Sequence, residues 1–121
     1  MNRQPKILYI DDESDLLNLA ASFFEDESMQ IETCTSFSEA LDKIRSVQYD
    51  VIISDAGMPV GGGKELLNII RQENVFNGKF ILVTGNLNYQ EQKEKDPFDL
   101  VLIKPIRLGD LVDRVKGMLL T

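Results

Sequence analysis

Five residues with the chemistry of a phosphoryl-binding site each stand directly after an apolar run of the sequence or one residue beyond it. They are Asp11, Asp12, Asp55, Thr84 and Lys104. Carboxylate oxygens are the ligands that Mg²⁺ prefers, and a carboxylate can also attack phosphorus as a nucleophile. An ammonium group can contact the oxygens of a phosphoryl group, and so can a hydroxyl group. Brought together, these residue types would form a site for a divalent cation and a phosphoryl group.

The apolar runs that precede these residues have the length of buried strands. Strands are predicted at Lys6–Ile10, Val51–Ser54, Lys79–Val83 and Leu100–Ile103, with a shorter one at Ile31–Cys34. In an open parallel α/β sheet, ligands bind outside the carboxyl ends of the strands. Residues far apart in the chain are therefore expected to meet at one edge of the sheet.

Amphipathic helices are predicted between the strands, because apolar residues recur there at helical spacing. The first helix would take Ser14 or Asp12 as its N-cap, and the second would open at Ser36 or Ser38. The expected buried faces are Leu16, Leu17, Ala20, Phe23 and Phe24, then Phe37, Ala40, Leu41 and Ile44, then Leu66, Leu67 and Ile70, and finally Leu108, Leu111, Val112, Val115 and Leu119.

The order of these elements predicts the fold class. Asn77-Gly78 marks a turn before the fourth strand, and the mostly polar stretch 86–95 predicts a short surface helix. Five strands alternating with four or five helices indicate an α/β fold, a doubly wound parallel sheet with helices on both faces.

Composition limits the classes of function. The chain has 121 residues, the size of one domain, and no apolar run approaches the ~20 residues that a membrane span needs. Without a signal-peptide pattern and with Cys34 as its single cysteine, we expect a cytoplasmic protein. A net charge of −7 argues against nucleic-acid contact by this domain. The absence of histidine excludes triad hydrolases and most zinc enzymes.

Together these features resemble the receiver domain of bacterial two-component response regulators, over essentially the whole chain. The motifs are the acidic pair, Asp55-Ala-Gly-Met-Pro59 followed by Gly63, then Thr84 and Lys104-Pro105. The resemblance implies one receiver domain, 1–121, with a flavodoxin-like fold of strand order 2-1-3-4-5. It also implies two partners, a sensor histidine kinase or phosphotransfer protein as the donor and an unknown downstream protein or output domain.

The resemblance gives the acidic residues specific roles. Asp55 would be the phosphoacceptor. Asp12, Asp55 and the backbone carbonyl of Gly57 would bind Mg²⁺ directly, and Asp11 would reach the ion through water. Such a domain promotes only its own phosphorylation and dephosphorylation, so it would not be an enzyme in the usual sense.

The same resemblance assigns the residues around the phosphoryl group. Lys104 would neutralise one phosphoryl oxygen, and Thr84 would donate its hydroxyl to another. A cis peptide bond would precede Pro105, and the small Gly85 would leave the phosphate entrance open. The new charge would then shift a two-state equilibrium in the last two α/β units.

Three features depart from the family pattern. Val101 stands where many receivers carry an aromatic residue that turns inward, and Phe98 or Tyr89 could substitute for it. Gly61 replaces a bulky apolar residue, so the glycine-rich loop at 60–63 would be either mobile or a tolerant surface turn. The polar stretch 88–95 would alter the face that partners read.

Two other functions are weighed against a working receiver. A pseudo-receiver would bind its partner without phosphorylation, although the complete set of site residues argues against this. A phosphatase of the haloacid-dehalogenase type would need a second Asp two residues after its nucleophile, where this chain has Gly57. The sequence leaves open whether the chain is a stand-alone regulator or a piece of a larger protein.

Overall fold

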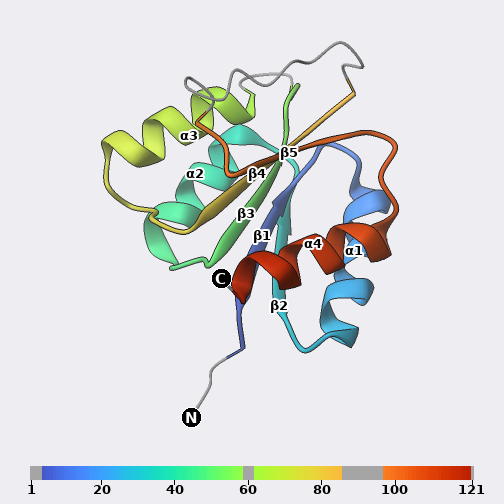
Figure 1. The fold of residues 1–121 in the computed structure, drawn as a ribbon. Coiled ribbons are helices and arrows are strands. Elements are labelled where there is room, and N and C mark those ends of the chain that lie inside the picture. Colours follow the sequence, from blue (N-terminus) through green and yellow to red (C-terminus); the bar gives the residue numbers. More distant parts are fainter. Residues whose placement is uncertain (1–3, 59–61, 86–96, 121) are drawn as a thin grey trace.

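A computed structural model describes residues 4–58, 62–85 and 97–120, and it contains one five-stranded sheet (Figure 1). The strands are β1 (Lys6–Ile10), β2 (Gln30–Cys34), β3 (Val51–Asp55), β4 (Lys79–Thr84) and β5 (Leu100–Ile103). They are parallel and lie in the order β2-β1-β3-β4-β5, which confirms the predicted fold class and strand order. Both β3 and β4 run one residue further than predicted, because Asp55 pairs with Val83 and Thr84 pairs with Ile103.

Helices cover both faces of this sheet. Within the described residues they are α1 (Ser14–Asp26), α2 (Phe37–Ser46), α3 (Gly63–Gln72) and α4 (Leu108–Leu119). Figure 1 shows α1 and α4 on one face and α2 and α3 on the other. The surface helix predicted at 86–95 lies outside the described residues. Among the residues that are described, no helix is long and apolar enough to cross a membrane.

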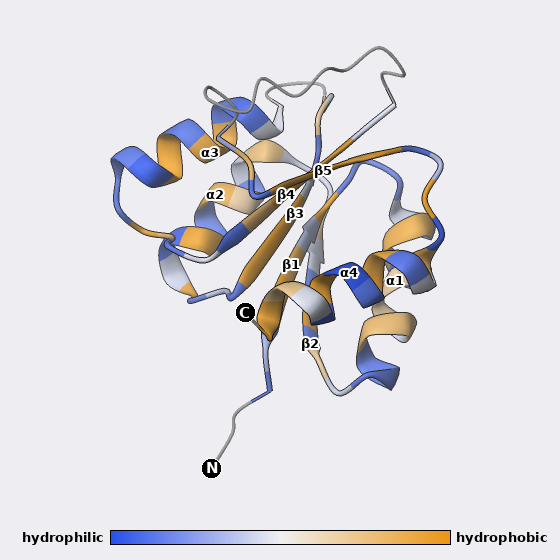
Figure 2. Ribbon diagram, viewed as in Figure 1, coloured by the Kyte–Doolittle hydropathy of each residue, from blue (hydrophilic) through white to orange (hydrophobic). Residues whose placement is uncertain are grey.

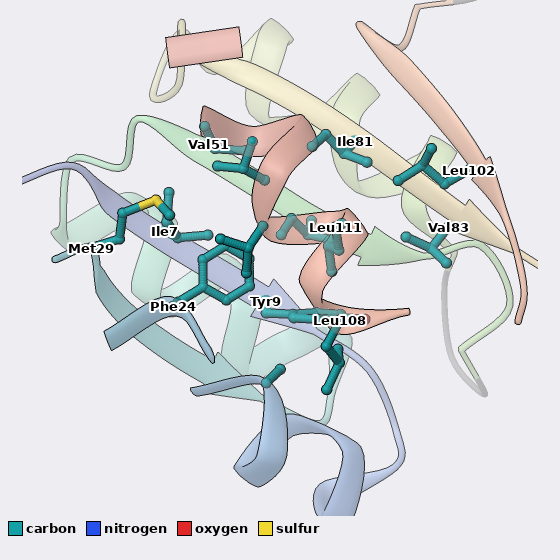
Figure 3. Close-up of a cluster of buried hydrophobic side chains, with 14 of the residues drawn as sticks. Ile7, Tyr9, Phe24, Met29, Val51, Ile81, Val83, Leu102, Leu108 and Leu111 are labelled. Carbon is teal, nitrogen blue, oxygen red and sulfur yellow. The ribbon is translucent and has the colours of Figure 1, made fainter. Parts of the chain in front are cut away.

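Alternation along the strands divides the interior into two cores. In β1, Ile7 and Tyr9 belong to the core under α1 and α4, whereas Leu8 and Ile10 belong to the core under α2 and α3. Figure 2 shows apolar residues concentrated along the central strands, and Figure 3 shows the first core in detail. Phe23 was wrongly predicted to face inward: it is 40% exposed, because the buried stripe of α1 is Leu17, Ala20 and Phe24.

Two predicted helix caps have different outcomes. Ser36 does cap α2, because its hydroxyl oxygen accepts a hydrogen bond from the Glu39 amide at 3.2 Å. The prediction for α1 was wrong, since its N-cap is Glu13, which makes no side-chain cap bond. The Glu13 amide instead donates to Oδ1 of Asp11 at 2.9 Å. This bond ties the start of α1 to the end of β1.

Candidate functional site

Strand register assembles the acidic cluster. Strands β1 and β3 are hydrogen-bonded neighbours with Ile10 opposite Ser54, so the next residues, Asp11 after β1 and Asp55 at the end of β3, lie side by side. Carboxylate oxygens of Asp11, Asp12 and Asp55 all lie within 4.8 Å of one another. The three carboxylates that the sequence predicts to meet therefore do meet.

Two of these three carboxylates are buried in the folded protein. Asp11 is fully buried and Asp55 is 8% exposed, whereas Asp12 is exposed. Burying charged groups is unfavourable unless they are paired or coordinate a metal. Like charges at this distance also repel one another. The cluster therefore favours any cation that can lie among its oxygens.

Lys104 supplies one positive charge to the cluster from the end of the edge strand β5. Its Nζ lies 3.2 Å from Oδ2 of Asp11 and 3.6 Å from Oδ2 of Asp55. The residue follows β5, and its amide donates to the carbonyl of Thr84 at 2.7 Å. The bond to Pro105 is cis, as the family resemblance implied. Through its amide Lys104 is bound to the end of β4, and through its ammonium group it contacts the carboxylates at the ends of β1 and β3.

Thr84 and Gly57 lie at the same edge of the sheet. Thr84 ends β4 and is 5% exposed. The Gly57 amide makes a long contact of 3.5 Å with Oδ1 of Asp55. Among the residues that the structure describes, a Cβ added at Gly57 or at Gly85 would meet no other atom within 4 Å.

Burial and the close charges of the cluster shift the pKa values of Asp55 and Lys104. Burial, with smaller contributions from the charges of Asp11 and Asp12, raises the pKa of Asp55, against the opposing effects of Lys104 and the Gly57 amide. Burial alone would lower the pKa of Lys104, but its hydrogen bond to Asp11 and the charges of Asp11 and Asp55 outweigh burial and raise it. Lys104 thus remains an ammonium group and only partly compensates the carboxylates.

The donor set suits magnesium. Three carboxylates at one sheet edge offer oxygen ligands only, and an exposed rim beside Asp12 and Gly57 leaves room for the waters that Mg²⁺ retains. A cluster of this kind is typical of a Mg²⁺ site. The Gly57 carbonyl stays a prediction, because no interaction of that oxygen is established.

Three residues beside the acidic cluster were not predicted from the sequence. Tyr9 is 1% exposed, and burial together with the charges of Asp11, Asp55 and Glu13 raises its pKa. Its place two residues before Asp11, on the same side of a strand, was the available signal. Glu13 holds Asp11 through its amide. Gly62 comes close to the Ala56 carbonyl, a contact that sequence alone does not reveal.

The structure describes some of the residues that depart from the family pattern. Val101 is half-buried in β5 opposite Leu82. Phe98 packs against Phe80 with ring centroids 5.8 Å apart, near the start of β4 and away from Thr84 at its end, so it does not take the place of the expected aromatic. Tyr89, Val60 and Gly61 lie outside the described residues.

Comparison with known sequences supports the same assignment. The model of the response regulator receiver domain matches residues 7–116. Among curated proteins, the transcriptional regulatory protein ResD of Bacillus subtilis is 28% identical over 116 residues, covering 96% of this chain and 48% of its own length. TrcR of Mycobacterium tuberculosis, also a transcriptional regulatory protein, is 28% identical over 94% of this chain and 45% of its own. The chain spans about half the length of these relatives.

Solved structures give the same result in three dimensions. The receiver domain of the Francisella response regulator 1452 matches with a TM-score of 0.84 and 31% identity, covering 95% of this chain and 96% of that one. The response regulator TrrA of Thermotoga maritima, solved in complex with Mg²⁺-BeF, matches with a TM-score of 0.81 and 30% identity, covering 95% and 99% of the two chains. With the acidic cluster and Lys104 in place at the carboxyl edge of such a sheet, this chain belongs to the response regulator receiver domain family.

Proposed function

We propose that Asp55 is the phosphoacceptor of this receiver domain. One carboxylate oxygen attacks the phosphorus of the donor, and the bond between phosphorus and the donor's leaving group breaks. The electron pair of that bond stays with the leaving group, so Asp55 becomes an acyl phosphate. The chain is a signalling module rather than a catalytic enzyme, because this transfer changes the domain itself.

One observation carries the proposal. Three carboxylates lie within 4.8 Å of one another, and a lysine ammonium reaches two of them at 3.2 and 3.6 Å. Phosphoryl transfer depends mainly on positioning and on neutralising charge. Asp55 is the member that ends a strand directly, and its Oδ1 lies 3.5 Å from the amide of the exposed Gly57.

We assign Mg²⁺ binding to Asp11, Asp12, Asp55 and the backbone carbonyl of Gly57. When bound, the ion would supply positive charge that offsets the carboxylates and the incoming phosphoryl group. The complex of TrrA with Mg²⁺-BeF supports this assignment, because that protein resembles this chain over nearly its whole length. Asp11 also positions the site through its bond from the Glu13 amide.

Thr84 and Lys104 are assigned to the phosphoryl oxygens. Phosphoaspartate brings up to about two negative charges into the cluster. Lys104 already lies 3.6 Å from Asp55 and would pair with one oxygen after transfer. The hydroxyl of Thr84 would donate to another oxygen, and the bond from the Lys104 amide to the Thr84 carbonyl would make the two residues respond together.

The partners follow from family membership and from the relatives. A receiver of a two-component system takes its phosphoryl group from a histidine kinase, and we propose that a phosphotransfer protein can also serve. We propose that residues 1–121 form one receiver domain working in the cytoplasm, where kinases find ATP. The curated relatives are transcriptional regulatory proteins about twice as long, so an output domain or a separate downstream protein would read the switched face.

Intact-mass measurement with acetyl phosphate tests the assignment. The wild-type protein should gain one phosphoryl group when Mg²⁺ is present and none when the metal is chelated. Asp55→Asn should gain none under either condition. Asp42→Asn, a change on the exposed surface of α2, should behave as wild type.

The same experiment separates a working receiver from a pseudo-receiver. A folded wild-type protein that binds Mg²⁺ and yet gains no phosphoryl group would refute the proposal. That result would indicate binding to a partner without phosphorylation, with Val101 as the first residue to examine.

A further inference from the structure

A second pocket lies beside the phosphoryl site, on the face of the sheet covered by α1 and α4. It has a volume of about 400 Å³, and its lining includes Tyr9, Glu13, Leu16, Lys104, Ile106 and Leu108. These residues come from the end of β1, the start of α1 and the connection between β5 and α4. Sites for small organic molecules commonly have volumes of roughly 300–1,000 Å³.

The pocket has an apolar body and a few polar groups. Leu108 is 8% exposed and Tyr9 is 1% exposed, so both can contribute only to the floor. Leu16 and Ile106 are half-buried and form the walls, while Glu13 is exposed at the rim. Figure 3 shows Tyr9 and Leu108 next to each other in the core below. An apolar pocket with few polar groups is the usual composition of a small-molecule site.

The Tyr9 hydroxyl is the feature that points to a ligand. No hydrogen bond joins it to another residue that the structure describes. In that part of the chain, no fully enclosed side-chain oxygen or nitrogen lacks a partner. The hydroxyl must therefore reach the small exposed part of Tyr9, and that part lies in the pocket. A nearly buried donor without a protein acceptor is incomplete, because buried polar groups normally form hydrogen bonds.

Charge around the pocket restricts what can enter it. Glu13 lies on the rim, and Asp11, Asp12 and Asp55 lie just beyond Lys104. Before any phosphoryl transfer, the Lys104 ammonium is paired with Asp11 and Asp55, so the carboxylates around the pocket outnumber this one positive charge. Negative charge on a ligand would be repelled, and a positive charge could pair with Glu13.

We propose that this pocket binds a small, mainly apolar organic molecule that carries a hydrogen-bond acceptor and is neutral or cationic. The acceptor takes the proton of the Tyr9 hydroxyl, the apolar body lies against Leu16, Ile106 and Leu108, and any amine pairs with Glu13. Lys104 lines both this pocket and the phosphoryl site. Occupancy of the pocket and the position of Lys104 are therefore linked, and linkage acts in both directions.

A titration of the free protein with para-methoxybenzylamine tests the proposal. This probe has an aromatic body, an ether oxygen as acceptor and an ammonium group. Amide NMR spectra should show saturable shifts at Tyr9, Leu16 and Ile106, with a dissociation constant on the order of several mM for a molecule of this size. No phosphodonor or Mg²⁺ is added, so the result does not depend on the proposed phosphorylation.

Two related probes and two variants make the test specific. Tyr9→Phe should weaken para-methoxybenzylamine roughly fivefold, the effect of one lost hydrogen bond, and leave the acceptor-free para-methylbenzylamine unchanged. Tyr49→Phe removes another buried tyrosine hydroxyl, which donates to Glu32 at 2.8 Å, and should change neither affinity. The anionic para-methoxybenzoate should bind more weakly than either amine.

Several outcomes would overturn the proposal. Absence of saturable shifts, or shifts centred away from Tyr9 and Ile106, would exclude a ligand site here. Equal affinity of the wild type and Tyr9→Phe for the methoxy probe would mean that water alone serves the hydroxyl. Equal binding of the benzoate would refute the charge argument.

Discussion

The ammonium group of Lys104 bridges two carboxylates from different strands, at 3.2 Å from Oδ2 of Asp11 and 3.6 Å from Oδ2 of Asp55. Asp11 follows β1 and Asp55 ends β3, while Lys104 follows β5 at the edge of the sheet. This lysine therefore partly fills the electrostatic role of a cation in the acidic cluster. A divalent ion that enters must compete with it for the same oxygens.

Removing that competitor should tighten Mg²⁺ binding. Lys104→Met deletes a positive charge next to two ligands, so the affinity for Mg²⁺ should rise by roughly three- to tenfold at low salt. Calorimetric titration without a phosphodonor measures this. Lys116→Met is the matched control, because it removes the same charge from a surface pair with Glu27 and should leave the affinity unchanged. Weaker binding by Lys104→Met would show that the lysine supports the metal site instead.

Asp55 should lower the stability of the metal-free protein at neutral pH. Its folded-state pKa is raised above the ordinary value of 3.8, mainly by burial, so the ionised form is disfavoured in the folded state. Asp55→Asn should raise the free energy of unfolding by about 1–2 kcal/mol at pH 7 with a chelator present, as changes at strained functional sites commonly do.

The pH dependence of that gain follows from the sign of the shift. Because the folded state holds the Asp55 proton more tightly, its stability falls as pH rises from 3.8 through the folded-state pKa. The advantage of Asp55→Asn should be complete above that folded-state pKa and shrink as pH falls toward 3.8. Urea unfolding at several pH values measures it, with Asp42→Asn as a surface control. A gain that grew with acidity would contradict the assigned direction.

We expect that Gly62 cannot be replaced by a residue with a side chain without loss of stability, whereas Gly57 can. A Cβ at Gly62 would collide with the backbone carbonyl of Ala56, which cannot move without shifting the loop after Asp55. Gly62→Ala should lower the free energy of unfolding by about 1–3 kcal/mol and slow phosphorylation. Gly57→Ala adds a methyl group in open space and should stay within about 0.5 kcal/mol of wild type. Equal urea midpoints for the two variants would refute the close contact.

The sequence was sufficient for the sheet and for the charged residues of the site. Short apolar runs that alternate with amphipathic helices indicate a parallel sheet with its polar strand ends at one edge. The family resemblance supplied the strand order, and the pairing of β1 with β3 then brings Asp11 beside Asp55. The first helix cap was not predictable in this way. Asp11 accepts the Glu13 amide on one oxygen and the Lys104 ammonium on the other, and the second of these contacts comes from a residue far away in the chain.

Close approaches of the backbone were equally hidden from sequence. The glycines at 61–63 suggested a mobile or tolerant loop, but Gly62 and Gly63 lie close to their surroundings. A Cβ at Gly63 would lie 2.5 Å from Cδ1 of Leu82. The positions of glycines in a sequence do not show whether a glycine provides backbone flexibility or is required because there is no room for a Cβ. Phe98 is a second example. Its closeness to Val101 in the sequence suggested that it could replace the missing aromatic residue, but in the structure it packs on Phe80 of β4.

We expect Thr84 to be needed for the conformational change that follows phosphorylation more than for the phosphoryl transfer to Asp55. Thr84→Val keeps the shape of a buried residue and removes the hydroxyl. Asp55 should still accept a phosphoryl group from acetyl phosphate. A hydrogen bond to a charged group contributes about 1.5–3 kcal/mol, so the population of the switched state should fall by roughly tenfold or more.

Amide NMR spectra with beryllofluoride and Mg²⁺ measure that population. Shifts along β4 and β5 should be large in wild type and small in Thr84→Val. If both proteins show the same shifts, Thr84 does not couple the phosphoryl group to the end of β4.

The most direct test of the central claim is to locate the phosphoryl group chemically. Borohydride reduces an aspartyl phosphate to the alcohol and releases phosphate, so the modified residue becomes homoserine and can be found by peptide mass spectrometry. After treatment with acetyl phosphate and Mg²⁺, homoserine should occur at position 55 alone and disappear when the metal is chelated. Homoserine at position 11 or 12, or at no position in a protein that has gained phosphate, would contradict the assignment of Asp55.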